Sequence, residues 1–139
     1  MKKMLLISTL FIVMSVTSAE QEYFYDEYRI SEMLEVLGYM TFQESFLLKC
    51  KADYPELSLK IEETTALLQP YLKKIDKYFL NERAPIELRE QYRKADYKKY
   101  TYEQVENDFT NGKYKLENCK FAVWSIKEEG IDPVIMSYL

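Results

Sequence analysis

The side chains that could do chemistry in this chain are carboxylates, because its 139 residues include no His. The absence of His excludes Ser-His and Cys-His catalytic pairs, a His-bearing zinc site and the side chain best suited to proton transfer near neutral pH. Acidic residues lie close together in three pairs: Glu62 and Glu63, Glu103 and Glu106, Glu128 and Glu129. Glycoside cleavage needs two carboxyl groups facing each other across a cleft, about 5 to 9.5 Å apart, which neighbours on one helix face do not provide. We therefore expect no catalytic residue, and a small carboxylate-dependent hydrolase is a minor alternative.

Cys50 and Cys119 are the only cysteines. A redox pair would favour close spacing such as Cys-x-x-Cys, or an exposed and positively charged setting, and neither is visible. An even number of cysteines in an exported chain indicates a structural disulfide. We therefore predict a Cys50–Cys119 bond, which by loop entropy contributes roughly 4 kcal/mol at most to stability.

The stretch from Leu88 to Tyr102 interleaves Lys and Arg with Tyr, a composition found on binding surfaces. Seven side chains are the candidate partner-binding residues: Arg89, Tyr92, Arg93, Lys94, Tyr97, Lys98 and Tyr100. Three acids, Glu87, Glu90 and Asp96, dilute the positive charge and argue against nucleic acid. The simplest interpretation is a solvated helix face, and if the stretch binds a partner, an acidic protein surface or an envelope glycan suits it better than nucleic acid does.

The first nineteen residues have the features of an export signal. Lys2 and Lys3 precede an apolar run, Met4 to Val16, and small residues lead to a cleavage site after Ala19. The run is shorter than the about 20 residues that a permanent membrane helix requires. We expect residues 1–19 to be removed, leaving residues 20–139 as one domain in the periplasm or secreted.

The mature chain would be acidic. Because residues 1–19 hold two Lys and no acid, their removal changes the net charge from −4 to about −6. The acids concentrate between Glu20 and Leu37, where Arg29 is the only base, so this acidic lead-in is a second possible contact surface. No Asp-x-Asp-x-Asp-Gly loop for Ca²⁺ is present. We expect no nucleic acid, metal or cofactor.

Three Gly and four Pro in a chain rich in Leu, Glu, Lys and Tyr favour helices joined by short loops, and we predict an all-α bundle of four or five helices. An apolar stripe in the first helix contains Ile30, Met33, Leu34 and Leu37. Gly38 either ends that helix or lies inside a longer one, because Thr41 and Glu44 form a capping-box pattern for a second helix. The clearest stripe alternates spacings of four and three: Leu57, Ile61, Thr64, Leu68, Tyr71, Ile75 and Tyr78. Pro70 lies within it and predicts a kink or a break.

The second half of the chain begins with a connection at residues 81–84. A helix at the edge of the bundle should follow Pro85 and extend from Ile86 to Tyr100. Thr101 and Gln104 form a second capping-box pattern for the next helix, which Asn111-Gly112 ends. The last stripe comprises Leu116, Cys119, Val123 and Ile126, with Gly130 as its end and a tail from Asp132 that either packs back or frays.

The order of a signal, Cys50, Tyr54-Pro55-Glu56-Leu57, a long helix and Cys119 resembles small exported all-helical bacterial proteins with one Cys pair. That resemblance covers most of the mature chain and implies no activity. In size, export and disulfide the chain is also similar to helical periplasmic immunity proteins that neutralise wall-degrading toxins. The expected function is therefore a non-catalytic protein-binding module, an inhibitor or immunity-type factor whose partner is another envelope or secreted protein. The alternative outside catalysis is a structural envelope component that forms homo-oligomers.

Overall fold

The computed structural model describes residues 27–80 and 84–139, and over these residues it is an all-α bundle. Its helices are α2 Glu27–Asp53, α3 Ser58–Leu80, α4 Ile86–Lys94, α5 Tyr97–Thr110, α6 Leu116–Trp124 and α7 Pro133–Tyr138. A 3-10 turn at Pro55–Leu57 and a π-helical turn at Ser125–Glu129 complete it. The predicted fold class is confirmed, with six α-helices in place of four or five. The predicted signal, residues 20–26 of the acidic lead-in and residues 81–83 of the connection lie outside the described residues.

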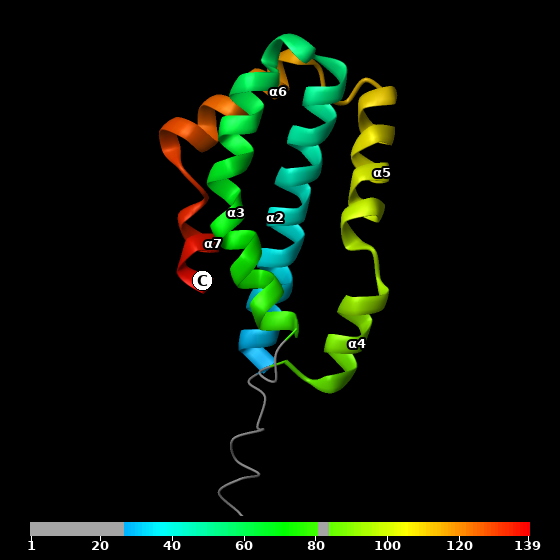
Figure 1. Cartoon of the computed structure of the whole chain (residues 1–139), viewed down its shortest axis with the longest axis vertical. Helices are drawn as coiled ribbons and strands as arrows, with labels where there is room; N and C mark the ends of the chain where they lie inside the picture. Colours follow the sequence, from blue (N-terminus) through cyan, green and yellow to red (C-terminus); the bar gives the residue numbers. More distant parts are fainter. Residues whose placement is uncertain (1–26, 81–83) are drawn as a thin grey trace, which may run out of the picture.

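The bundle is built around α2, which lies between α3 and α5 and also contacts α6 and α7 (Figure 1). With 27 residues, α2 is about 40 Å long and sets the long dimension of the molecule. The turn at Pro55–Leu57 reverses the chain, so α3 returns antiparallel to α2 (Figure 1). α5 extends along the opposite side of α2.

α2 is a single helix that continues through Gly38 and Thr41, so the alternative of two helices is wrong. Its central position explains why: four consecutive residues, 44–47, are all buried, because neighbours surround the helix at this level. Leu34 was expected in the core but is 42% exposed, while Val36 is fully buried. A central helix is buried on more than one side. A prediction that allows only one buried face therefore assigns the residues at the edges of that face wrongly.

The predicted apolar face of the 3-10 turn and α3 is confirmed up to Leu68, and beyond Pro70 two of the three predicted positions are displaced by one residue. Five predicted positions are buried: Leu57, Ile61, Thr64, Leu68 and Ile75. Beyond Pro70, Leu72 and Phe79 are buried, whereas Tyr71 and Tyr78 are only partly buried. A repeat of 3.5 residues drifts by about 20° per heptad against a helix of 3.6 residues per turn, which accounts for the shift. The helix continues through Pro70, so the alternative of a break there is wrong.

The helix boundary expected near Thr101 is wrong, because the chain breaks earlier. Ala95 is extended, with φ −81° and ψ 127°, and ends α4. The Asp96 carboxylate accepts a hydrogen bond from the Lys99 amide at 3.1 Å and caps α5. Thr101 therefore lies inside α5. Asp is among the strongest N-cap residues, so it prevails over the Thr101–Gln104 pattern.

The disulfide between Cys50 and Cys119 is present and joins α2 to α6, with an S–S distance of 2.11 Å and a Cα–Cα distance of 5.7 Å. Both cysteines are fully buried. Val123 and Ile126 continue the buried face of α6, as predicted, while Leu116 is partly buried. The Gly130 amide then donates to the Ser125 carbonyl at 3.1 Å, which closes the π-helical turn.

The C-terminal tail packs back on the bundle. Ile135 of α7 is buried, and the Arg29 guanidinium of α2 donates to the Tyr138 carbonyl. Arg29 also lies over the ring of Tyr78, with 5.9 Å from its central carbon to the ring centroid. α7 therefore forms part of the same core. Across the described residues, no helix has both the length and the apolar composition needed to cross a membrane.

Candidate functional site

The structure divides the seven candidate binding residues between the inside and the outside of the bundle. Tyr92 is the most integrated: its ring stacks on Phe79, with centroids 4.8 Å apart, and its hydroxyl donates to the Asp76 carboxylate. Burial raises the pKa of the Tyr92 hydroxyl, and the Asp76 hydrogen bond raises it further. This tyrosine therefore attaches α4 to α3.

Tyr97 and Lys98 also point toward the bundle. The Tyr97 ring packs against Tyr92 at 5.8 Å, and the Lys98 ammonium lies 3.3 Å from the carboxylate of Glu44. Glu44 is only 9% exposed, so Lys98 and Gln69, whose amide donates to it at 3.4 Å, satisfy a buried acid. These contacts hold α5 against α2 and α4, and α3 against α2.

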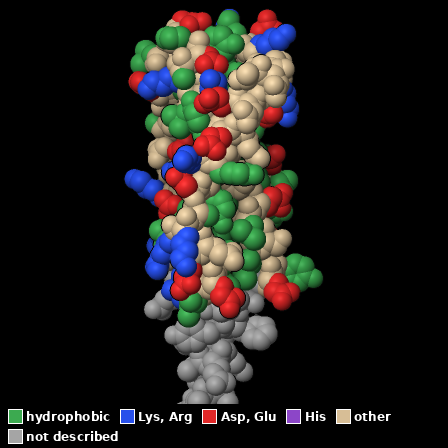
Figure 2. Space-filling view, turned by 90° about the vertical axis from the view of Figure 1, so that its right-hand side faces the viewer, with side chains coloured by type: hydrophobic (Ala, Val, Ile, Leu, Met, Phe, Trp, Pro, Cys, Tyr) green, Lys and Arg blue, Asp and Glu red, His purple; other side chains and the backbone are tan. Residues whose placement is uncertain are grey.

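The remaining candidates do not form one surface with these residues. Arg93 and Lys94, in the last turn of α4, are exposed, as is Tyr100 at 64%. Arg89 is partly buried, and its Nε has no hydrogen-bond partner among residues 27–80 and 84–139. Figure 2 presents the side of the molecule where α4 and α5 lie, with basic, acidic and hydrophobic side chains mixed on it. The exposed residues of the predicted site are therefore Arg93, Lys94 and Tyr100, together with Lys98, whose side chain is 59% exposed although it pairs with Glu44.

A cavity of about 170 Å³ lies beneath the α4–α5 connection. Its lining includes Leu37, Ile75, Asp76, Tyr92 and Asp96. Three of the polar side chains on its wall already have partners, because Asp76 accepts from Tyr92 and Asp96 caps α5. The cavity therefore offers no free polar group of these three for a ligand.

The paired acids lie on exposed helix surfaces. Glu62 bonds to Lys51 at 2.7 Å, and Glu63 bonds to Lys127 at 2.6 Å. The hydrogen bond and the charge of Lys127 hold the pKa of Glu63 below its usual value. A general acid needs the opposite, a carboxyl with a raised pKa in a dry environment. Within residues 27–80 and 84–139, no group of three or more Cys, Asp or Glu is arranged to hold a metal ion.

A surface that the sequence reasoning missed lies on α6. Phe121 is 63% exposed and Trp124 is 51% exposed, and their ring centroids are 6.0 Å apart. Large exposed aromatic residues are unusual on a solvated helix and are characteristic of contact surfaces. The sequence position of these two residues could have predicted their exposure. Both fall outside the Cys119–Val123–Ile126 stripe, so a helix that buries the stripe must expose them.

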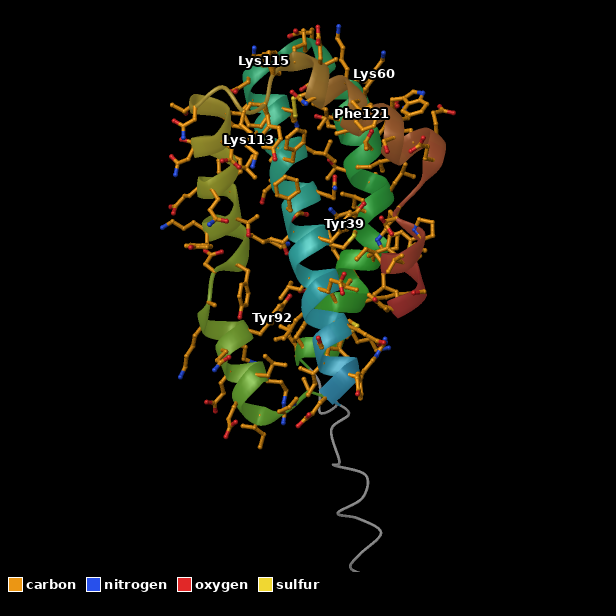
Figure 3. All side chains as sticks on the ribbon, turned by 180° about the vertical axis from the view of Figure 1, so that it is seen from behind. Tyr39, Lys60, Tyr92, Lys113, Lys115 and Phe121 are labelled. Carbon is orange, nitrogen blue, oxygen red and sulfur yellow. A yellow bond between two sulfur atoms is a disulfide. The ribbon has the colours of Figure 1, made fainter. Side chains whose placement is uncertain are left out.

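Two grooves flank this aromatic pair. One, which we call the Phe121 groove, has a volume of about 210 Å³ and is lined mainly by Tyr39, Phe42, Phe46, Tyr114, Phe121 and Ile126. Rings packed edge to face build its wall, with the Phe46 and Tyr114 centroids 5.0 Å apart at 89°. Tyr39 and Phe121 lie on the same side of the molecule in Figure 3.

The second, which we call the Trp124 groove, has a volume of about 320 Å³ and is lined by Leu57, Lys60, Lys120, Val123, Trp124, Lys127 and Glu128. Its base consists of the two buried aliphatic residues, and its rim carries three Lys and one Glu. Lys60 and Phe121 lie at the same end of the bundle, and Tyr92 lies toward the other end (Figure 3). The α6 surface, defined as Phe121, Trp124 and these two grooves, is therefore separate from the predicted α4–α5 site.

Comparison with protein-family models, curated proteins and solved structures gave no match for this chain. Function is therefore inferred from the residues and their geometry.

Proposed function

We propose that the mature protein, residues 20–139, is an exported, non-catalytic module that binds another envelope or secreted protein through its α6 surface. The observation that supports this most is the exposed pair of Phe121 and Trp124 between two largely apolar grooves. Contact surfaces concentrate their binding energy in a few large residues, with Trp among the commonest. The signal-like residues 1–19 and the buried disulfide support export to an oxidising compartment.

The finer proposal is an inhibitor or immunity-type factor, which would block the activity of its partner by covering it. A stable interface buries about 800 Å² on each partner, which is more than one aromatic pair can provide. Phe121 and Trp124 would therefore form the centre of the interface, and the rims of the two grooves its margin. The exposed Arg93, Lys94 and Tyr100 are the competing location for such an interface.

The test is crosslinking and capture with the oxidised mature protein as bait in an envelope extract. We expect one specific partner, lost on Phe121→Ser/Trp124→Ser and kept in the matched control Ile86→Ser, since Ile86 is 62% exposed but lies on α4. Reversal of charge at Arg93 and Lys94 should leave capture unchanged. Loss of the partner only in that charge-reversed variant would move the interface to α4–α5.

Recovery of the bait alone, in both wild type and variants, would contradict the proposal. It would favour the structural component that forms homo-oligomers, detectable by its mass in solution, or the carboxylate hydrolase. If a partner is captured, its enzymatic activity with and without the module distinguishes an inhibitor from a passive binder.

A further inference from the structure

We propose that the Trp124 groove accommodates an acidic peptide segment of the partner, in which one large apolar side chain has carboxylates on both sides. This inference rests on the proposed function, because it names the kind of segment that the bound protein presents.

The interior of the groove is suited to an apolar side chain. Leu57 and Val123 form its base and are 8% and 6% exposed, so neither offers a polar group. Half of the Trp124 surface remains open to the groove side and to solvent, which leaves ring area for a second apolar group to cover. The groove volume of about 320 Å³ provides room for one large side chain.

The rim is suited to carboxylates. Lys60 projects from α3 and Lys120 from α6, so two ammonium groups approach the groove from different helices. Among the residues that the structure describes, neither has a carboxylate within 4.0 Å, although the charge of Lys60 also helps to lower the pKa of Glu63; Lys127 is bonded to Glu63 at 2.6 Å. The lining carries three Lys and one acid, Glu128, and because Glu63 pairs with Lys127 the groove is positive by about one charge. Electrostatic complementarity therefore favours an anionic occupant over a neutral or cationic one.

The placement of Lys60 and Lys120, the two Lys of the lining without an ion pair to a described residue, favours a peptide over a fatty acid. A fatty acid carries one carboxylate at one end of its chain, and would leave one Lys without a partner. A peptide can place acidic residues on both sides of a central ring. Lys60 and Lys120 would then each gain a partner while the ring covers Trp124.

The test is a fluorescence titration of the oxidised mature protein with a labelled peptide that has a central Phe between two Asp-Glu pairs. We expect saturable binding below about 1 mM that weakens as salt is raised from about 0.05 to about 0.5 M. Lys60→Gln/Lys120→Gln should weaken it about 2- to 30-fold, since each exposed pair is worth little individually. Trp124→Ala should weaken it as well.

Matched controls separate charge at the groove from charge in general. Lys73→Gln/Lys77→Gln removes two exposed Lys elsewhere on α3 and should leave the affinity unchanged. Peptides with Ala in place of Phe, or Gln in place of the acids, should bind more weakly than the parent peptide.

Three results would overturn the inference: no peptide binding, equal binding by Lys60→Gln/Lys120→Gln, or tighter binding of decanoate than of the peptide at the same groove. If a partner is captured in a Phe121- and Trp124-dependent way but the peptide does not bind, only this inference fails. If neither partner nor peptide binds, the proposed function fails with it.

Discussion

The ring of Tyr92 on α4 lies almost parallel to the ring of Phe79 on α3, with their planes at 12° and their centroids 4.8 Å apart. Phe79 is fully buried, and α4 has no buried residue of its own. Tyr92 therefore covers one end of the core and supplies the principal packing contact of α4. Tyr92, predicted from the sequence as a partner-binding residue, therefore has a structural role.

Replacing Tyr92 with Phe should cost about 1 kcal/mol of unfolding free energy near pH 8. The substitution keeps the stacked ring and removes only the hydrogen bond to the Asp76 carboxylate, which is partly buried. Chemical denaturation with urea measures the difference. Tyr100→Phe is the control, because Tyr100 is 64% exposed and its replacement should change nothing.

The unfolding free energies of wild type and Tyr92→Phe should become more alike as the solution becomes alkaline. Burial and the Asp76 bond raise the pKa of Tyr92 in the folded state above its ordinary value of 10.0. This contribution is fully present below about pH 10 and is lost as the pH rises toward the folded pKa, since only the unfolded chain releases the proton. The free-energy gap between wild type and Tyr92→Phe should therefore stay constant up to about pH 10 and narrow as the pH rises above that value. A constant gap would show that the hydroxyl is not held in its protonated form.

Leu68→Ala should destabilise the protein by about 2 to 5 kcal/mol, because Leu68 is fully buried and its truncation leaves a cavity in the core. Leu67→Ala is a matched control on the next residue of the same helix. Leu67 is 48% exposed, so its loss should cost less than about 1 kcal/mol. Denaturant midpoints that are equal for the two variants would show that the assigned face of α3 is wrong.

The disulfide should be intact in the isolated protein and protected from reductant. Mass spectrometry after alkylation without reductant should detect no free thiol, since Cys50 and Cys119 are bonded. Because both are fully buried, dithiothreitol should reduce the bond slowly in buffer and rapidly in urea. Cys50→Ala/Cys119→Ala should lower the unfolding free energy by roughly 4 kcal/mol at most. Two alkylated thiols in the oxidised sample would disprove the pairing.

Two glycines should respond to Ala in opposite directions. Gly38 lies inside α2, and apart from its chain neighbours and the adjacent backbone of α2 a Cβ there would meet no described atom within 4 Å, so Gly38→Ala should stabilise by about 0.5 to 1 kcal/mol. Gly130 has φ +85°, where an L side chain is strained, so Gly130→Ala should destabilise by about 1 kcal/mol. Thermal unfolding of both variants measures the two signs. Stabilisation by both would contradict the backbone conformation at Gly130.

Phe121→Ser/Trp124→Ser should remain folded, with a change in unfolding free energy within about 1 kcal/mol. Both rings are more than half exposed, so they contribute little to the core. Far-ultraviolet circular dichroism and the denaturant midpoint test this expectation. A large loss of stability would mean that a failed capture experiment reports unfolding and not a lost contact surface.

The sequence was most informative where one face of a helix meets the core. Leu57, Ile61 and Leu68 lie where their spacing predicted, and the pairing of two cysteines has only one solution. It was less informative for α2, because a helix surrounded by neighbours has no single polar side that marks its orientation. The continuity through Gly38 is a tertiary effect, since packing along 27 residues outweighs the weak helix propensity of one glycine.

The candidate surface was harder to predict than the fold, because residue type does not state which side a residue faces. The Tyr92 and Tyr97 rings pack inward, while Phe121 and Trp124 lie outside. The tyrosines face inward because the break at Ala95 reorients α5 relative to α4. Phe121 and Trp124 face outward because the disulfide at Cys119 fixes which side of α6 meets α2.

The buried bond between α2 and α6 also constrains the order of events during biogenesis. Cys119 lies twenty residues before the last residue of this sequence, so nearly all of it must be synthesised before the bond can close. Once α6 has packed, no oxidant can reach either sulfur, because both cysteines are fully buried. Oxidation must therefore precede the final docking of α6 or occur while that helix is transiently detached. The fraction of time that α6 spends undocked therefore sets how fast the bond can form.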